Sequence, residues 1–514
     1  MFRRAALLAA VAIAFADSAI VVLALPDLLL QWDVSINEVA WVVTSYNVAL
    51  ALAALALVPF GLRFDPVRLA LWGSVAFVLA SLGCAVAPDV WVLIAFRAVQ
   101  GVAAAALLVG ALPVLSALSS RGSALWAGAG VFGAALGPAL GGALTDVFSW
   151  RAIFYAQAPV ALLGVVALAG LRGRMPLVYE RPQRSVRGSV ALGLVSAALV
   201  GVLFLGVVQL IDVWRLSPLG AGVVVSVIPL ATLIAAVAGA RLGSSAIVAG
   251  ALLLSAGLAG MAFLPGRDLA WVVAALGVAG FGFGLVMPRL TRTTTGATAV
   301  WIRHAGLVVG LLVITPVLTD DLLSAGDQAK LRGISVALDA PVPASAKVRL
   351  GIALAPVLSR PTRKELPDFT KAVASQHDPV LTEVGRTLDH VVQGTITRAF
   401  RNSFLISALF ALAAAVPFAF RARPARAPVV ALAVGLALVG AELASGALTY
   451  GARPELLPAC ADRPSESELL KALDFVACRV HKSREQFVAD VAEAGVSAVD
   501  FLKQIERIAS LLTG

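Results

Sequence analysis

Apolar segments of about 20 residues follow one another along most of this chain, separated by short polar stretches. A helix that rises about 1.5 Å per residue needs about 20 apolar residues to cross about 30 Å of lipid hydrocarbon. With 60% hydrophobic and only 14% charged residues, the chain has more apolar surface than a water-soluble protein could bury. The sequence therefore predicts an all-α polytopic membrane protein.

The segments fall into two groups of six. The first group lies near residues 5–26, 39–61, 67–87, 90–115, 124–144 and 152–171. The second group lies near residues 189–211, 219–240, 246–264, 269–288, 300–318 and 402–420, and one more segment near 428–450 brings the expected total to about thirteen. The chain begins like a signal peptide, but the apolar pattern continues past Asp17 to Pro26, so a retained first helix is expected.

Basic residues gather at alternate ends of these segments, and this pattern predicts the orientation in the membrane. They are Arg3, Arg4, Arg63, Arg68, Arg121, Arg241, Arg289 and Arg292, then Arg421, Arg423 and Arg426. The richest linker carries Arg172, Arg174, Arg181, Arg184 and Arg187. Basic loops stay inside, so the N-terminus and this linker are expected in the cytoplasm, residues 27–38 outside, and the C-terminus outside a plasma (inner) membrane. The net charge of +10 then implies no nucleic-acid partner.

The expected organisation follows from these spans. An N-terminal six-helix bundle covers residues 1–171, and a basic cytoplasmic linker covers 172–188. The first five helices of the second bundle cover 189–318, the twelfth helix covers 402–420, and an extra helix covers 428–450. The polar segments 319–401 and 451–514 are expected to form an extracytoplasmic helical cap, which could bind a protein partner. Residues 32–35 and 214–217 share a Trp-x-x-Ser pattern before a helix, which suggests that the bundles are repeats.

The chain has only three cysteines and four histidines, so potential metal ligands and catalytic imidazoles are few. No metal site, cofactor or imidazole-based active site is expected. Cys460 and Cys478 lie in the last polar segment, where either a disulfide or two free thiols is compatible with the sequence. The nearest approach to a catalytic cluster comprises His377, Asp378, Asp389 and His390. Their irregular spacing favours solvated helix faces, so an enzyme is not expected.

Charged residues lie inside several predicted spans, where a charge is costly unless it is paired or faces a cavity. Asp17 lies in the middle of the first span, and Arg97 lies in the fourth, close to Gln100. Since a guanidinium stays charged in nearly any environment, Arg97 is the natural partner for Asp17. Other cavity candidates are Gln100, Tyr46, Asn47 and Arg303, the last either at the cytoplasmic mouth or as an anchor among the headgroups.

The fifth span contains small residues spaced for close contact between helices, with one proline that can bend the helix. These residues are Gly133, Gly137, Pro138, Gly141 and Gly142. Glu442, in the extra helix, is expected either to have a structural partner or to lie at a different depth than the predicted span gives it, rather than to form a second proton site.

The segment from Gly133 to Gly142 resembles the antiporter motif of major facilitator drug:proton exporters. Asp17 to Pro26 is similar to the first-helix motif of their EmrB/QacA-type branch, and Arg97 with Gln100 resembles the fourth-helix motif. The resemblance implies a major facilitator fold of two six-helix bundles, proton coupling through Asp17 and Arg97, and a tightly packed interface at the antiporter glycines. Ala19 and Val22 replace two polar residues of the family, so few polar partners are expected around Asp17.

The resemblance implies proton-coupled export of amphipathic or lipid-like small molecules by alternating access between the two bundles. The alternative is a receptor or scaffold that kept the fold and lost transport, with an outer domain that binds a partner. The retained Asp17, Arg97 and glycine motif favour the transporter.

Overall fold

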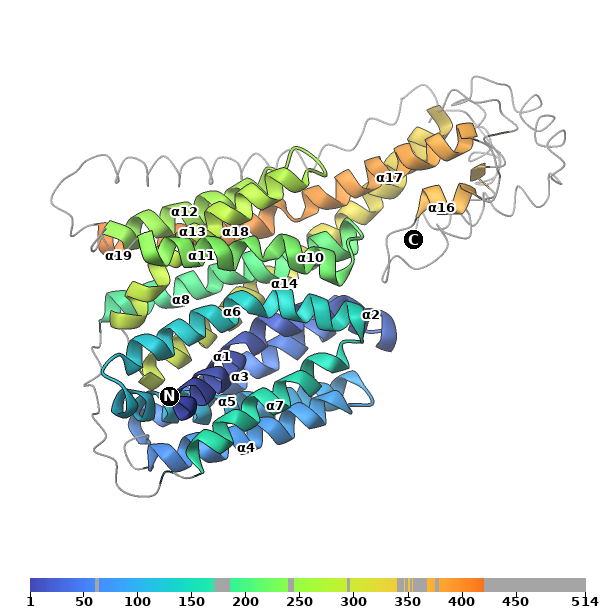
Figure 1. Cartoon of the computed structure of the whole chain (residues 1–514). Helices are drawn as coiled ribbons and strands as arrows, with labels where there is room; N and C mark the ends of the chain where they lie inside the picture. The colour runs from blue at the N-terminus through green and yellow to red at the C-terminus, as the bar shows by residue number, and fades with distance from the viewer. Residues whose placement is uncertain are drawn as a thin grey trace. The chain divides into compact units, whose positions relative to one another are not determined.

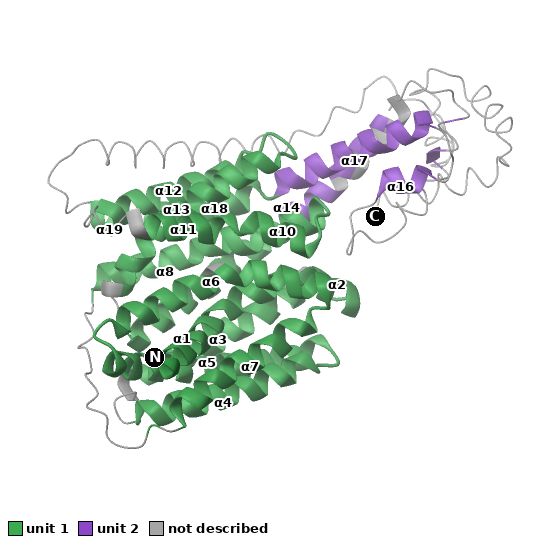
Figure 2. Cartoon of the chain, in the orientation of Figure 1, with its two compact units in different colours: residues 1–319, 400–439 green, residues 320–399, 440–514 purple. Residues whose placement is uncertain are grey.

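The fold is seen in a computed structural model of the chain, which is helical throughout its described regular elements (Figure 1). The structure describes residues 1–60, 64–169, 171, 185–238, 245–293, 296–339, 346, 350–351, 354, 368–374 and 379–419. The chain divides into two compact units (Figure 2). Unit 1 holds Met1–Thr319 and Phe400–Val439, and unit 2 holds Asp320–Ala399 and Gly440–Gly514.

The first half of unit 1 contains six membrane-length helical segments. They are α1 (Phe2–Ile20) with the 3₁₀ turn η1 (Val21–Ala24) and α2 (Leu25–Trp32), then α3 (Ile36–Phe60), α4 (Pro66–Ala85), α5 (Val90–Leu118), α6 (Gly122–Val147) and α7 (Arg151–Leu168). An aspartate side chain caps the N-terminus of α4 and of α5. Asp65 accepts a hydrogen bond from the backbone N–H of Val67, and Asp89 accepts from the backbone N–H groups of Trp91 and Val92. These side chains satisfy backbone N–H groups that would otherwise lack a partner at the start of α4 and α5.

The expected end of the first helix at Pro26 is wrong. Pro26 lies in the first turn of α2, where a missing backbone N–H leaves no hydrogen bond broken. The helix therefore continues to Trp32 and ends where Asp33 adopts a left-handed conformation with φ of 53°. Only the residues after Trp32 form the turn into α3.

The second half of unit 1 is also helical. Its elements are α8 (Val186–Val200), the π-helical turn η3 (Gly201–Leu205), α9 (Gly206–Val208), the π-helical turn η4 (Gln209–Val213), α10 (Pro218–Val225), α11 (Val227–Ala238), α12 (Ser245–Ala262), α13 (Leu269–Thr293), the first part of α14 (Gly296–Asp339), α18 (Arg401–Ala413) and α19 (Val416–Ala419). The eleventh helix does not end at Leu318 as expected. The apolar pattern stops there, but residues with good helix propensity continue and carry α14 to Asp339.

Eleven described helices are long and apolar enough to cross a membrane, and α6 makes twelve if its two bent parts form one span. Its parts, Gly122–Ala134 and Leu136–Val147, meet at an angle of 40°. Pro138 explains the bend, because it cannot donate the backbone hydrogen bond that would reach Ala134, four residues earlier. These twelve match the two predicted groups of six. The thirteenth, at 428–450, lies outside the described residues, as do most of the linker 172–188, Glu442 and the segment 451–514.

The internal repeat suggested by the sequence has a backbone counterpart. Among the described residues other than glycine, only Asp33 and Arg215 have a positive φ, at 53° and 56°. Each follows the tryptophan and precedes the serine of the matching motif. Ser35 exchanges hydrogen bonds with Glu38 at the start of α3, and Ser217 accepts one from the backbone N–H of Gly220 at the start of α10. The same turn therefore begins the second span of each half.

Unit 2 contains α16 (Phe369–Ala374) and α17 (Pro379–Ala399), together with the end of α14. Asp389 on α17 accepts hydrogen bonds from the backbone N–H groups of Phe369 and Thr370 at 3.1 and 3.0 Å. This carboxylate therefore caps α16, and the expectation of a solvated helix face is wrong for it. His377 and Asp378 lie outside the described residues. Within the described part of the chain, no three His, Cys, Asp or Glu side chains are placed to hold a metal ion.

Candidate functional site

Asp17 and Arg97 form an ion pair that is fully buried in the first half of unit 1. α1 carries Asp17 in its last turn, near the middle of the continuous span Phe2–Trp32, and α5 carries Arg97 two turns after the Asp89 cap. The Nη1 atom of Arg97 donates to Oδ2 of Asp17, and Nε donates to the carbonyl oxygen of Val42 at 3.0 Å. The guanidinium also lies over the ring of Tyr46, with its carbon 4.3 Å from the ring centroid. The two charges in this part of the membrane thus neutralise each other.

Two amide side chains complete the network around the pair. Nε2 of Gln157, on α7, donates to Oδ1 of Asp17 at 2.7 Å. Gln100 accepts from Nη1 of Arg97 at 2.7 Å and donates to Gln157 at 2.9 Å and to Ser81 on α4 at 2.8 Å. Both oxygens of Asp17 are therefore held by donors from other helices.

Sequence reasoning missed Gln157 and Ser81, and the expectation of few polar partners around Asp17 is wrong. That expectation considered only α1, where Ala19 and Val22 are apolar. The donors come instead from α5 and α7, up to 140 positions away. One available signal was the isolated amide of Gln157 in an apolar span, because an amide in hydrocarbon needs partners.

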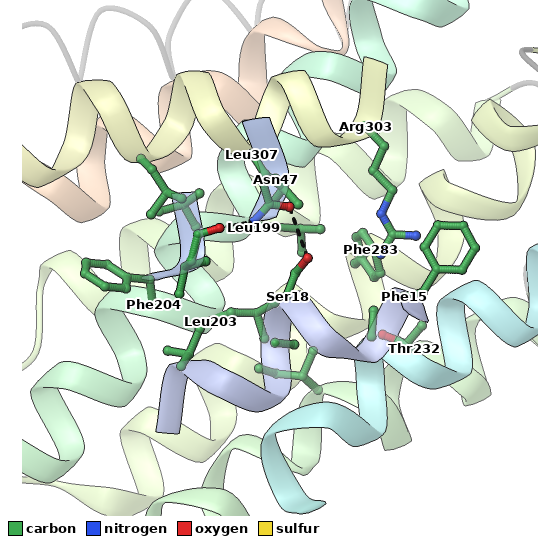
Figure 3. Close-up of a pocket in the computed structure, with 17 residues that line it drawn as sticks. Phe15, Ser18, Asn47, Leu199, Leu203, Phe204, Thr232, Phe283, Arg303 and Leu307 are labelled. Atoms are coloured by element: carbon green, nitrogen blue, oxygen red, sulfur yellow. Dashed lines mark hydrogen bonds between the residues drawn. The ribbon is translucent and has the colours of Figure 1, made fainter. Parts of the chain in front are cut away.

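A pocket lies between the two halves of unit 1 (Figure 3). α1, η1, α3 and α6 line it from the first half, and α8, η3, α11, α13 and α14 line it from the second. Its walls are mostly apolar. The lining residues are Phe15, Ser18, Ala19, Val22, Val43, Asn47, Ala134, Leu199, Val200, Leu203, Phe204, Ile228, Thr232, Phe283, Arg303, Leu307 and Leu311. The pocket therefore offers a hydrophobic volume with a few polar groups, as a site for an amphipathic molecule would.

A polar contact joins the two halves beside the pocket. Oδ1 of Asn47 accepts from the hydroxyl of Ser18 at 3.0 Å and lies 2.7 Å from Nδ1 of His304 on α14. Since the amide nitrogen of Asn47 already donates to the carbonyl of Val43, its oxygen faces His304. The arrangement assigns the proton of the His304 ring to Nδ1. The contact therefore links α3 of the first half to α14 of the second.

The four cavity candidates separate into two pairs. Asn47 and Arg303 line the pocket. Gln100 and Tyr46 do not; Gln100 belongs to the Asp17 network, and the hydroxyl of Tyr46 donates to the carbonyl of Ala14 at 2.7 Å. Arg303 is only 7% exposed, so it is neither a headgroup anchor nor a residue of an open mouth in this structure.

The glycines of α6 let this helix approach α1 closely. A Cβ added at Gly133 would overlap the carbonyl oxygen of Ala12, and one at Gly141 would overlap that of Ile20. At Gly137 the added atom would lie 3.0 Å from the carbonyl oxygen of Ala16, the residue before Asp17. Three glycines spaced four apart therefore hold α6 against the helix that carries the buried carboxylate.

The same motif also contacts the second half. A Cβ added at Gly142 would overlap the carbonyl oxygen of Pro218 on α10, and one at Gly222 on α10 would lie 3.3 Å from the carbonyl oxygen of Pro138. The second half repeats the close packing of α6 on α1. Gly306 and Gly310 of α14 lie against the backbone of Gly193 and Ala197 of α8, where an added Cβ would overlap a carbonyl oxygen.

Replacing Gly133 by alanine is expected to destabilise the protein by about 1–3 kcal/mol, because the new methyl group forces α6 away from the backbone of α1. The matched control is Gly128→Ala on the same helix, where an added Cβ has no atom within 4 Å. That control should be neutral or stabilising by up to about 1 kcal/mol. Thermal unfolding in detergent measures both, and equal unfolding temperatures for the two variants would contradict the packing argument.

Cys84 is buried in α4, with its sulfur 3.7 Å from Oε1 of Gln100, and is the free thiol of the described residues. Cys460 and Cys478 lie outside them.

Comparison with known proteins agrees with this architecture. The family model of the Major Facilitator Superfamily matches residues 7–315. Among solved structures, a bacterial homologue of the human lysosomal transporter Spinster, in an inward-facing and occupied conformation, superposes with a TM-score of 0.56. The alignment covers 81% of this chain and 95% of that one, at 13% sequence identity. At this identity the likeness shows the fold alone.

Relatives with more similar sequences are named for drug resistance or drug export. The chain is 34% identical to multidrug resistance protein Stp of Mycobacterium tuberculosis over 155 residues, 29% of each chain. It is 33% identical to multidrug export protein EmrB of Escherichia coli over 164 residues, 31% of this chain and 32% of EmrB. It is 31% identical to the methylenomycin A resistance protein of Bacillus subtilis over 192 residues, 36% of this chain and 41% of the relative.

The chain thus spans less than half the length of these curated relatives. The alignments with EmrB and Stp confirm the resemblance to the EmrB/QacA-type branch. The family model covers more than half of the 514 residues, and the twelve described spans form the two six-helix halves that it implies. The chain is a multi-pass membrane protein and belongs to the major facilitator superfamily.

Proposed function

We propose that the protein exports amphipathic small molecules in exchange for protons, by alternating access between the two halves of unit 1. Asp17 binds the transported proton, and Arg97 competes with that proton for the carboxylate. The pocket between the halves binds the substrate. The N-terminus is on the cytoplasmic side of the plasma membrane in this proposal, as the distribution of basic residues predicts.

One observation carries the proposal: neighbouring residues of α1 serve the two sites. Asp17 faces the buried network of the first half, whereas Ser18 and Ala19 line the pocket. A change of charge at Asp17 therefore acts on the helix that forms a wall of the pocket. Coupling needs no long pathway across the protein.

The proton and the substrate would act through differential affinity. A proton on Asp17 removes the negative charge that holds Arg97, while the Val42 carbonyl and Gln100 keep the guanidinium partly satisfied. The carboxyl group is then free to leave Arg97 when the halves rearrange. A conformer that favours the protonated form and another that favours bound substrate together give exchange.

The names of the relatives support the export direction and the breadth of substrates. Stp and EmrB are named for multidrug resistance and multidrug export, and another relative for methylenomycin A resistance. An apolar pocket with few polar groups suits ligands that differ in shape but share a hydrophobic body.

Reconstitution tests the proposal. Purified full-length protein in liposomes with an imposed pH gradient should move at least one member of a panel of lipophilic cations and lipid analogues. The movement should stop when a protonophore collapses the gradient, because the gradient is the energy source. Fluxes equal to those of protein-free liposomes for the whole panel would reject the transporter.

The second compact unit supports a second candidate function. Its described helices are the end of α14, α16 and α17, and α17 buries apolar residues along its length. A receptor or scaffold with a protein partner at the outer face would use such a unit. In that case the liposome assay gives no flux, and the partner is sought by cross-linking unit 2 in intact cells.

A further inference from the structure

Arg303 is the charged residue of the pocket lining. Its side chain extends from α14 towards Phe15 (Figure 3). Only 7% of the residue is exposed, and Nε has no hydrogen-bond partner among the described residues. None of the ion pairs within the described part of the chain involves Arg303. The pocket therefore carries a positive charge that no described carboxylate neutralises.

The surroundings of Arg303 compensate this charge only in part. The guanidinium carbon lies 4.7 Å from the ring centroid of Phe15, a favourable but weak contact. Asn47 could accept a hydrogen bond, but its oxygen is already shared by Ser18 and His304. Arg97, the other buried arginine of the described residues, has Asp17 as its partner. Within the described part of the chain, Arg97 therefore meets a carboxylate and Arg303 meets none.

We propose that the anion missing at Arg303 is supplied by the substrate, so that the pocket selects amphiphiles with a negatively charged headgroup. This inference rests on the proposed function and narrows its substrate class. A guanidinium forms paired hydrogen bonds with carboxylate and phosphate oxygens alike, so both headgroups fit the chemistry. The apolar chain of such a molecule packs against Leu203, Phe204 and Leu311. A cationic headgroup is repelled by the same charge.

Equilibrium binding with three ligands of one chain length tests the proposal. Full-length protein in nanodiscs of neutral phosphatidylcholine is titrated with laurate, dodecyl phosphate and dodecyltrimethylammonium, without a pH gradient. We expect at least one anion to bind wild-type protein roughly tenfold or more tightly than the cation, as one charge-assisted contact would give. Laurate and dodecyl phosphate together distinguish a fatty-acid-like cargo from a phospholipid-like one.

Variants at Arg303 separate its charge from its shape. Arg303→Gln should weaken binding of the preferred anion roughly tenfold or more and remove the discrimination against the cation. Arg303→Lys keeps the charge but not the paired hydrogen bonds, so it should keep the preference for the anion and lose less affinity than Arg303→Gln. Arg68→Gln is the matched control, since the Arg68 side chain is 82% exposed, and it should bind like wild type.

Equal or tighter binding of the cation to wild-type protein would overturn the inference, and this comparison needs no variant to fold. Unchanged anion affinity in Arg303→Gln would also overturn it. Gradient-driven transport of dodecyltrimethylammonium that is indifferent to Arg303→Gln would reject the anionic substrate and keep the exporter. Binding of an anion that depends on Arg303, in a protein without gradient-driven flux, would keep the anion site and reject the exporter.

Discussion

Asp17→Asn is expected to abolish accumulation of substrate driven by a proton gradient. Asparagine keeps the size of the side chain and an oxygen that can accept from Arg97 and Gln157, but it cannot bind and release a proton. If Asp17 is the coupling site, the gradient then has no means of acting on the pocket through α1. Proteoliposomes with an imposed pH gradient measure the effect, and uptake should fall to the level of protein-free vesicles.

Two controls make this result specific. Asp146→Asn removes an exposed carboxylate near the end of α6 and should transport like wild type. Exchange of labelled for unlabelled substrate without a gradient should persist in Asp17→Asn, because it requires the pocket and the rearrangement but no proton. Gradient-driven uptake at the wild-type rate in Asp17→Asn would show that the proton binds elsewhere.

Replacing either member of the buried ion pair should lower the stability of the protein, and the loss should be larger for Asp17 than for Arg97. Asp17→Asn leaves the guanidinium of Arg97 charged and without its counterion, since arginine does not release its proton in proteins. Loss of one partner of a buried ion pair costs about 3–5 kcal/mol. Arg97→Gln leaves Asp17 instead, and a carboxylate can neutralise itself by taking up a proton. We therefore expect Asp17→Asn to be the less stable of the two variants.

The double variant Asp17→Asn/Arg97→Gln provides the control for this asymmetry. It removes both charges and keeps groups that can hydrogen-bond with Gln100 and Gln157, so it should recover most of the stability lost in Asp17→Asn. Thermal unfolding at neutral pH in one detergent compares the three variants. Equal losses in both single variants, or a double variant that loses the sum of the two, would show that the ion pair does not act as a unit.

Several features of the site followed from the sequence because they depend on local chemistry. A carboxylate in the middle of one apolar span and an arginine in another have few ways to avoid a large desolvation cost, so their pairing could be expected. The glycines of α6 could be assigned to close packing from their spacing alone. The repeated tryptophan and serine before α3 and α10 suggested an internal repeat, and the left-handed Asp33 and Arg215 lie at the matching position of each motif.

The ends of the first and eleventh helices were less predictable. The hydropathy of the sequence marks where the apolar residues stop, and a helix can continue beyond that point. Pro26 and Leu318 each mark a change in hydropathy, yet the backbone remains helical to Trp32 and to Asp339. A proline in the first turn of α2 breaks no hydrogen bond, and polar residues with good helix propensity extend α14.

By itself the sequence determined that lipid surrounds most of the chain, that the helices form two groups of six, that two charges are buried, and that α6 packs closely against another helix. Each of these depends on short-range patterns of hydrophobicity and residue size. Only the tertiary structure decided which side chains meet. Gln157 reaches Asp17 across 140 positions, and Asn47 meets His304 across 257. Arg303 lies buried in the pocket, and none of the described carboxylates pairs with it. The reason is physical: helix periodicity indicates which face of a helix is apolar, but the partner of that face is chosen by packing among all twelve spans.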